Sequence, residues 1–361
     1  MDAEVIIIGA GVVGAALAYG IAKQGRRVMV LDGEDRDLRA ARANFGLVWV
    51  QGKGANAPDY NQLTRQSADL WPEFLRELTD ATEVRVDYAR PGGLVFCLGQ
   101  AEYDARTALN QRMGNADTRM VERAELDRML PAAKLGPEVM GASYCESDGH
   151  VNPLQLLAAL HRGIAVHGGT ILFRNPVKAI TPAADGFTVE GASEEFKAKQ
   201  VIVAAGLATP SLTDPLNFTI PLHSERGQLL VTERIEPILP FPGSGLRQTA
   251  DGTVMIGATK EDETDRGVTV ASATRLATRA TRIIPALKSA RLVRQWSGFR
   301  VMPPDGSPIY AESADHPGLF AAACHSGITL AAAHAAIVAP AMLEGRLKAD
   351  LSAFSNGRFD A

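Results

Sequence analysis

The sequence predicts an α/β fold in which a Rossmann-like domain is interleaved with a second, α+β domain built on an antiparallel or mixed sheet. Three observations support this class. A strand, a glycine-rich turn, a helical segment and a second strand follow one another at the N-terminus. Several later strands are wholly apolar, and the segments between them alternate short strands with Gly and Pro turns. Wholly apolar strands are typical of sheets that helices cover on both faces.

The N-terminal elements form one βαβ unit. Residues 4–8 are a β-branched apolar run, residues 15–23 have helical composition, and residues 28–31 form a strand that ends at Asp32. Between the first strand and the helix, residues 9–14 have the sequence GAGVVG, a GxGxxG turn. A dinucleotide-binding turn requires this placement between a strand and a helix.

The rest of the chain supplies both domains. Residues 84–98 and 220–257 are expected to form antiparallel strands of the second domain. The other predicted elements are helices over 153–167 and 271–284 and strands over 170–173, 201–204 and 292–296. We therefore expect a discontinuous nucleotide-binding domain made of residues 1–83, 146–219 and 296–361, and a substrate domain made of residues 84–145 and 220–295.

Bulk composition excludes several functional classes. The 361 residues carry a formal net charge of −4 at pH 7, so no sequence-wide basic field draws the chain to nucleic acid. The three cysteines, Cys97, Cys145 and Cys324, are scattered and show no CxxC spacing, which argues against a disulfide framework and against a metal site. This cysteine usage fits a reducing, cytoplasmic setting.

No targeting or membrane segment is expected. The first apolar run follows Asp2 and Glu4 rather than the basic segment of a signal peptide. The alanine-rich residues 321–343 are interrupted by polar residues and by Pro340, so we expect a buried strand and helix there and no transmembrane segment.

Each part of the glycine turn has a physical role. Gly9 permits the tight turn, Gly11 lets a pyrophosphate approach the backbone, and Gly14 lets the helix pack closely on the strand. Asp32 can accept hydrogen bonds from ribose hydroxyls, and its charge disfavours a 2′-phosphate. The expected cofactor contacts in this unit are Gly9, Ala10, Gly11, Val12, Val13, Gly14, Asp32 and Gly33.

The glycine turn alone does not choose between FAD and NAD. After the second strand, residues 39–46 form a small and polar stretch that leads into the apolar residues 47–50, and such a segment could wrap an extended ligand. The expected contacts here are Ala41, Arg42, Ala43, Asn44, Gly46 and Leu47.

Seven motifs in order resemble the glycine oxidase, sarcosine oxidase and D-amino-acid oxidase superfamily of flavoproteins over nearly the whole chain. They are residues 9–14 with Asp32, 41–46, 90–94 (RPGGL), 149–153 (GHVNP), 201–206 (VIVAAG), 296–300 (WSGFR) and 323–330 (ACHSGITL). Within the superfamily, residues 44–54 most resemble the FAD-bearing β subunits of opine oxidases, D-hydroxyproline dehydrogenases and hydrogen cyanide synthase. Phe45 stands where a small residue is common in the superfamily.

The resemblance implies FAD, with its adenosine in the N-terminal domain and its isoalloxazine at the boundary with the substrate domain. It also implies that the backbone of Val177 meets the adenine and that Arg300 binds the substrate carboxylate. The flavin pyrimidine edge would lie at the start of the C-terminal helix. The further contacts that we predict on this basis are Ala205, Gly206, Gly298, Arg300, His325, Ser326, Gly327, Ile328 and Thr329.

The activity that the resemblance implies is oxidation of the C–N bond of a small amino acid or secondary amine. The candidates are a D-amino acid, D-hydroxyproline, an opine or glycine. Hydride transfer to flavin N5 would give an imine, with the substrate positioned by the protein and no dedicated base. The chain would be the catalytic subunit of a heteromeric dehydrogenase, cytoplasmic or peripheral at a membrane through partner subunits. An NAD-dependent dehydrogenase and a flavin-binding scaffold or electron-relay subunit are the alternatives.

The residues themselves leave several roles open. Arg300 lies among apolar and turn residues, so its charge needs either a substrate carboxylate or an ion pair within the chain. His325 is our second catalytic candidate, as a flavin contact or pocket wall, but it could equally be a satisfied core histidine. We expect Lys53 to be an exposed loop lysine, and we expect Cys324 not to act as a nucleophile. Substrate choice is expected to depend on pocket walls near residues 223–228 and Arg247–Gln248.

Overall fold

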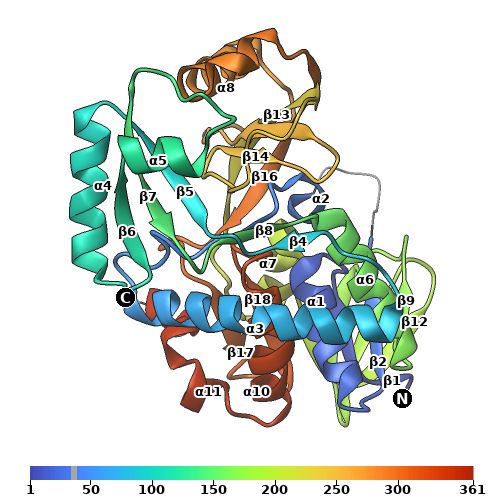
Figure 1. Cartoon of the computed structure of the whole chain (residues 1–361). Helices are drawn as coiled ribbons and strands as arrows, with labels where there is room; N and C mark the ends of the chain where they lie inside the picture. The colour runs from blue at the N-terminus through green and yellow to red at the C-terminus, as the bar shows by residue number, and fades with distance from the viewer. Residues whose placement is uncertain (34–38, 361) are drawn as a thin grey trace.

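The computed structural model describes residues 1–33 and 39–360. Its elements form a larger unit around a mainly parallel sheet and a second unit of antiparallel sheets, which lies above the first in Figure 1. Helices α4, α5 and α8 lie in the second unit, and α1, α3, α6 and α10 lie in the first. The predicted fold class is confirmed.

Within the described residues, the larger sheet has eight strands in which β1 pairs in parallel with β2 and β12, and β12 pairs in parallel with β18. Alternate residues of β1 enter two different cores. Val5 and Ile7 belong to one, and Ile6 and Ile8 belong to the other. This is why the strand is apolar at every position. The strands are β1 (Ala3–Ile8), β2 (Val28–Leu31), β9 (Thr170–Leu172), β10 (Ala179–Ala183), β11 (Gly186–Glu190), β12 (Glu195–Val203), β17 (Ile309–Glu312) and β18 (Leu319–Ala323).

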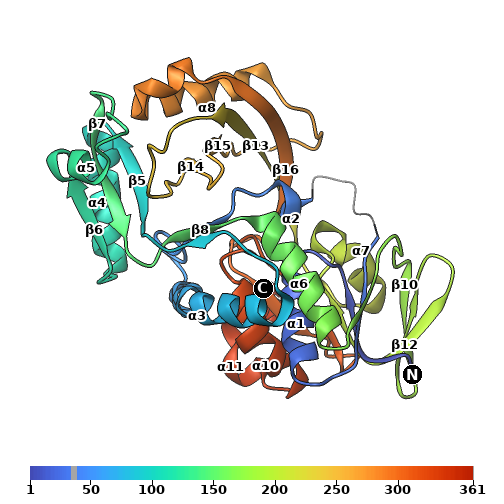
Figure 2. The same cartoon turned by 45° about the vertical axis from the view of Figure 1, so that its right-hand side comes forward.

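One face of this sheet is covered by four helical segments. Their buried residues share a single core with one side of the sheet, and in Figure 2 α1 and α6 lie side by side. The segments are α1 (Val12–Lys23), α3 (Pro58–Thr82), α6 (Pro153–Val166) and the run from Ala331 to Leu343, which comprises α9 (Ala331–Ala333), η4 (His334–Val338) and α10 (Ala339–Leu343). The opposite face forms a second core with α7 (Thr209–Thr213), and residues of the β10–β11 hairpin at the edge of the sheet contribute to it. Shorter segments complete the chain near the C-terminus and around α7, namely η1 (Gly206–Ala208), η2 (Asp214–Leu216), α11 (Leu347–Asp350), η5 (Ser352–Phe354) and η6 (Asn356–Phe359).

The second unit contains a four-stranded antiparallel sheet in the order β14-β15-β13-β16. Its elements are β13 (His223–Arg234), β14 (Leu246–Gln248), β15 (Thr253–Gly257) and β16 (Leu292–Met302), with α8 (Val270–Ile283) and η3 (Pro285–Ser289). A three-stranded sheet beside it comprises β5 (Gly93–Leu98), β6 (Thr118–Glu122) and β7 (Val139–Cys145), with α4 (Gln100–Met113) and α5 (Arg123–Met129). A small sheet of β3 (Leu47–Val48), β4 (Tyr88–Ala89) and β8 (Gly149–Val151) connects to the segment after α2 (Ala40–Ala43).

Two features differ from the sequence expectations, and a third agrees with them. The domain boundary predicted at residue 296 falls inside β16, which is one continuous strand of the antiparallel sheet. The long helix α3 was not anticipated. The segment 321–343 is the expected buried strand and helix, and in the described part of the chain no helix is long and apolar enough to span a membrane.

Candidate active site

The glycine turn before α1 has no room for a side chain at Gly9 or Gly14. Gly9 has φ +107°, and a Cβ there would lie 2.4 Å from the carbonyl oxygen of Ala204. A Cβ on Gly14 would lie 1.9 Å from the carbonyl oxygen of Gly9. Gly11 is the N-cap of α1 and gives no side-chain cap, while the nearest atom to a Cβ there would be Ala41 Cβ at 3.7 Å. The first-turn N–H groups are therefore available to a pyrophosphate, as a dinucleotide requires.

Asp32 directly follows β2 and is buried. Its carboxylate binds the guanidinium of Arg39 in a bidentate pair, with Nη1–Oδ1 2.9 Å and Nη2–Oδ2 3.1 Å. An adenosine ribose would thus share this carboxylate with Arg39. Asn175 N donates to Asp32 O at 2.8 Å, which brings the segment containing Val177 beside the end of β2. The adenine contact at Val177 stays a prediction.

The segment after α2 lies between the glycine turn and the antiparallel sheet. Asn44 Oδ1 accepts the N–H of Gly46 at 2.7 Å, and Gly46 has φ +80°. Trp296 Nε1 on β16 donates to Ala43 O at 3.0 Å, and Val151 N donates to Gly46 O at 2.8 Å. Residues 41–47 are therefore fixed where the two units meet, which is the position that the sequence predicts for the isoalloxazine.

A C-terminal segment, residues 324–330, is hydrogen-bonded to the chain that follows residues 41–47. Thr329 Oγ1 accepts Trp49 N at 3.1 Å and donates to Leu47 O at 3.3 Å. Thr329 O accepts Ser67 Oγ at 2.7 Å and Trp71 Nε1 at 3.0 Å, both from α3.

The helix that follows this segment starts later than expected, at Ala331, after a turn over residues 327–330, and it has no side-chain cap. Neither Ser326 nor Thr329 therefore caps the helix with its hydroxyl. Within the described residues, the N–H groups of Gly327 and Ile328 have no acceptor, so they are free to donate to a flavin edge.

Lys53, Tyr60, His325 and Ser326 form a polar cluster. Lys53 Nζ and Tyr60 OH both donate to Ser326 Oγ, the latter at 2.7 Å, and Lys53 Nζ lies 3.4 Å from His325 Nδ1. The expectation that Lys53 is an exposed loop lysine is wrong, because its ammonium is directed to the segment that follows β18.

Burial and neighbouring positive charges lower the pKa values of Lys53 and His325. The pKa of Lys53 is lowered to about 8, mainly by burial and in part by the charges of Lys260 and Arg300. Burial also holds the pKa of His325 well below its usual range, helped by Lys53, Arg300 and Lys260. His325 is accessible at its surface and yet desolvated by the surrounding protein, which favours a pocket wall over a core histidine.

Cys324 does not have the character of a nucleophile. It is buried, and burial raises the pKa of its thiol to about 12. Its nearest imidazole is His334, with Sγ–Nε2 at 4.0 Å, rather than His325. The thiolate needed for attack is therefore absent at neutral pH.

Arg300 extends from β16 across its neighbour β13. Its Nη1 forms an ion pair with Glu225 Oε1 at 2.7 Å, and its Nη2 donates to Thr259 O at 2.9 Å. A Cβ on Gly227 would lie 2.8 Å from Nη2, so the guanidinium lies flat over that glycine. Arg300 therefore has a partner within the chain, and its role as carboxylate ligand stays a prediction.

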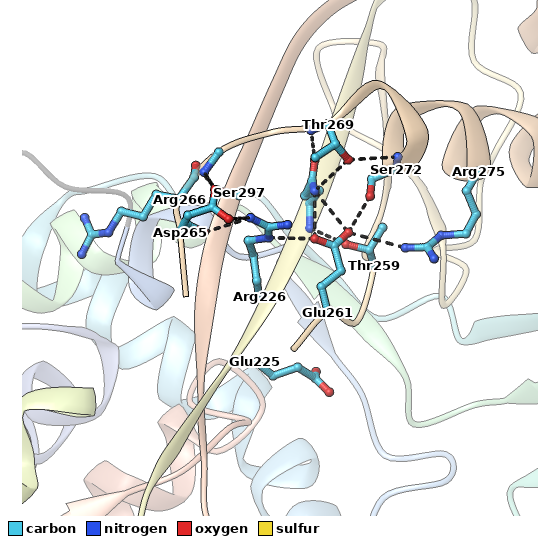
Figure 3. A network of polar contacts seen from close by, with 12 residues as sticks. Glu225, Arg226, Thr259, Glu261, Asp265, Arg266, Thr269, Ser272, Arg275 and Ser297 are labelled. Carbon is cyan, nitrogen blue, oxygen red and sulfur yellow. Dashed lines mark hydrogen bonds and ion pairs between the residues drawn. The ribbon is translucent and has the colours of Figure 1, made fainter. Parts of the chain in front are cut away.

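A second polar network holds Thr259 in place from the other face of β13 (Figure 3). Arg226 Nε binds Glu261 Oε2 at 2.7 Å, and its Nη1 binds Asp265 Oδ2 at 2.6 Å. Ser272 Oγ on α8 donates to Glu261 Oε1 at 2.6 Å. Glu225 lies apart from this network in Figure 3, consistent with the alternation of side chains along a strand. The segment 258–269 is thus fastened to the sheet and to α8.

The remaining predicted contacts lie on β16, after β12 and at the start of α1. Gly298 pairs with Gly227 across β16 and β13. Ala205 and Gly206 follow β12, and Gly206 has φ +60°. Val12 and Val13 begin α1, and Ala10 O accepts His161 Nε2 at 2.8 Å. Gly33 follows β2 and Arg42 lies within α2, and their contacts with a cofactor stay predictions.

Sequence reasoning missed several residues that build the site. Tyr60, Ser67 and Trp71 lie on α3, whose buried positions recur at helical spacing, and that periodicity could have revealed them. Asp148 is fully buried and accepts Val50 N at 2.6 Å and Gln51 N at 3.3 Å. Burial raises the pKa of Asp148 to about 7. Asp148 therefore holds Val50 and Gln51, which follow β3 and the predicted flavin contacts.

Comparison with known proteins identifies the family. The family model described as FAD-dependent oxidoreductase (DAO) matches residues 4–341. The chain is an FAD-dependent oxidoreductase of the DAO family. The NAD-dependent alternative is therefore wrong, and FAD is the cofactor that fits the glycine turn and the free N–H groups of the 327–328 segment.

Relatives of this DAO-family chain are similar over its full length. It is 40% identical to an opine oxidase subunit of Rhizobium meliloti and 42% identical to an opine oxidase subunit of Agrobacterium tumefaciens, in each case over 100% of this chain and 98% of the relative. The crystal structure of glycine oxidase from Geobacillus kaustophilus superposes with a TM-score of 0.89 at 26% identity, over 98% of each chain.

Proposed function

We propose that this flavoenzyme oxidises the C–N bond of a small amino acid or secondary amine that carries a carboxylate. The observation that supports it most directly is the grouping of Lys53, Lys260 and Arg300 around His325, beside the segments that fit FAD. The relatives named opine oxidase and glycine oxidase support the same class of substrate.

The positive charges of Lys53, Lys260 and Arg300 favour such a substrate in two ways. Positive charge attracts a carboxylate, and Arg300 can bind it in a bidentate pair if it shares or exchanges the carboxylate of Glu225. Positive charge also lowers the pKa of a substrate ammonium, which favours the neutral amine that can be oxidised. Bound FAD would accept the two electrons of the reaction. The chain's own residues would orient the amine and keep it deprotonated.

The test is anaerobic mixing of the FAD-loaded protein with D-amino acids, N-alkyl amino acids, D-hydroxyproline and opines. Loss of the oxidised flavin absorbance with at least one amine is the expected result, and bleaching by the isolated chain would exclude a pure scaffold or electron-relay role. If none of these compounds bleaches the flavin, the proposed activity is wrong.

We also propose that the chain is the catalytic subunit of a heteromeric dehydrogenase. The support is that both opine oxidase relatives are named as one subunit of that enzyme rather than as the whole of it. Purification under native conditions from its own cells should yield a complex with a second polypeptide in fixed stoichiometry. A complex that contains copies of this chain alone would contradict the proposal.

A further inference from the structure

Arg247 is a buried cation without a carboxylate partner among the residues that the structure describes. It lies on β14, and only 4% of its surface is exposed. Its Nη1 approaches His150 Nδ1 at 3.3 Å and its Nη2 approaches Met255 Sδ at 2.8 Å, while its Nε has no hydrogen-bond acceptor in the described structure. Both acceptors are neutral and weak. Arg300 and Arg226 on the same sheet differ, because each has an acidic partner.

Sheet register places Arg247 on the face that carries Arg300. Arg247 pairs with Met255, Met255 with Val231, and further along β13 Glu225 pairs with Arg300. Directly paired residues of antiparallel strands lie on one face, and alternate residues of β13 from Glu225 to Val231 share that face. This face of the sheet is directed to residues 41–47, the predicted flavin contacts. Trp296, on the same face of β16, donates a hydrogen bond to Ala43 O.

The guanidinium of Arg247 points to the predicted flavin contacts. It lies 5.9 Å from the centroid of the Phe45 ring, and a Cβ on Gly46 would lie 3.2 Å from its Nη2. His150 supplies no charge, because burial lowers its pKa to about 4 and leaves it neutral. A buried guanidinium with unused donors and no anion is costly unless a ligand brings the anion.

We propose that Arg247 is a second anion-binding subsite, which takes a carboxylate on the arm of the substrate amine opposite the one held by Arg300. This inference rests on the proposed function and narrows it to secondary amines that carry a carboxylate on both arms. Arg300 lies over Gly227, and Arg247 is level with Val231, four residues along β13. Four residues of a strand span about 13 Å, and the two strand spacings from β13 to β14 add about 10 Å across the sheet. The two carboxylates therefore lie at opposite ends of an extended molecule.

The first test measures binding without turnover. Thioether diacids, in which sulfur replaces the amine nitrogen and one to three methylenes precede the second carboxylate, are titrated against the flavin absorbance of the holoprotein. Each is compared with a thioether that ends in methyl instead. We expect one diacid to bind about 100-fold more tightly than its methyl counterpart and to lose that advantage in Arg247→Met. Equal affinities for every pair in the wild-type protein would overturn the subsite.

The second test measures turnover with the matched amines, N-(carboxyalkyl)glycines against N-alkylglycines. Arg247→Met should lower kcat/KM about 100-fold for the diacid and leave the monoacid nearly unchanged, with Arg247→Lys intermediate. Arg294→Met is the control, because Arg294 is an exposed arginine on the same face of the sheet. Equal losses on both substrates, or an altered flavin spectrum of the free variant, would show that Arg247 supports the fold or the flavin instead.

The two proposals fail in different ways. If no amine bleaches the flavin but a diacid still binds through Arg247, the proposed oxidation fails and the anion subsite stands. If N-alkylglycines bleach it and diacids show no advantage in either test, amine oxidation stands and the subsite is wrong.

Discussion

Charged residues near the predicted flavin site differ in the partners that balance them. Arg300 is paired with Glu225, Lys53 donates to the hydroxyl of Ser326, and Arg247 has no carboxylate partner in residues 1–33 and 39–360. A cation with an internal partner can exist without substrate, whereas one without a partner depends on a ligand. These differences determine what each substitution is expected to do.

Arg300→Met is expected to keep FAD bound and to weaken the substrate. The guanidinium contacts Glu225, Thr259 and Gly227 rather than the glycine turn, so the flavin content should be unchanged. The KM should rise about 100-fold because a bidentate contact to carboxylate is lost. Steady-state kinetics and flavin quantification check this, and unchanged kinetics would remove Arg300 from the site.

Lys53→Met is expected to move the acidic limb of the kcat profile to higher pH. Below its pKa of about 8 the Lys53 ammonium is charged and lowers the pKa of a nearby substrate ammonium. Without this charge the bound amine should hold its proton to higher pH, by about one unit. The pH dependence of kcat in both proteins is the measurement, and coincident acidic limbs would show that Lys53 acts elsewhere.

At the scale of single residues, sequence motifs predict where a functional residue lies but not which side chain it contacts. The positions of Arg300 and His325 follow from sequence motifs, because these motifs are local. The ion pair of Arg300 with Glu225 could not be foreseen, since it depends on the register of β13 against β16. Arg247 was noted only as a pocket wall, because nothing in a single sequence shows that a guanidinium lacks an anion.

Among the elements, α3 has the largest unforeseen role. The βαβ unit was predicted from its alternation of apolar strand, glycine turn and helix, and the structure has these elements at nearly the same residues. Helix α3 carries a similar periodic signal in Tyr60, Leu63, Ser67 and Trp71 but was overlooked. That it holds Thr329, more than 250 residues away along the chain, is a tertiary fact that no local pattern contains.

Ser67→Ala tests that role. It removes one of the two donors to Thr329 O, so the free energy of unfolding should fall by about 1 kcal/mol and the Kd for FAD should rise about fivefold. Thr64→Ala is the control, because its buried hydroxyl bonds to Tyr60 O within the same helix. Urea unfolding and FAD titration measure both effects, and equal changes in FAD affinity for the two variants would contradict a specific role of Ser67.

For the molecule as a whole, stability depends on junctions between sheets, and Asp148 lies at one of them. Its carboxylate joins the segment at Val50 and Gln51 to the β7–β8 region. Its folded-state pKa of about 7 is above the ordinary value of 3.8, so the folded state holds this proton more tightly than the unfolded chain.

The free energy of unfolding is therefore expected to decrease as the pH rises. The contribution of Asp148 is fully present below about pH 4 and is lost as the pH rises through about 7, by roughly 4 kcal/mol at most. Asp148→Asn should remove this part of the pH dependence. Urea unfolding of both proteins between pH 4 and 8 checks it, and parallel profiles would show that the carboxyl is not protonated in the folded state.

The interleaved path of the chain constrains how the cofactor is acquired during synthesis. The glycine turn leaves the ribosome early, but β1 pairs with β12, β12 pairs with β18, and the segment through Thr329 emerges more than 300 residues after Gly14. At roughly 5–20 residues per second, β1 can pair with β2 at once, but its other edge waits tens of seconds for β12. Flavin capture is therefore a late event, and chaperones have a long interval in which to bind the growing chain.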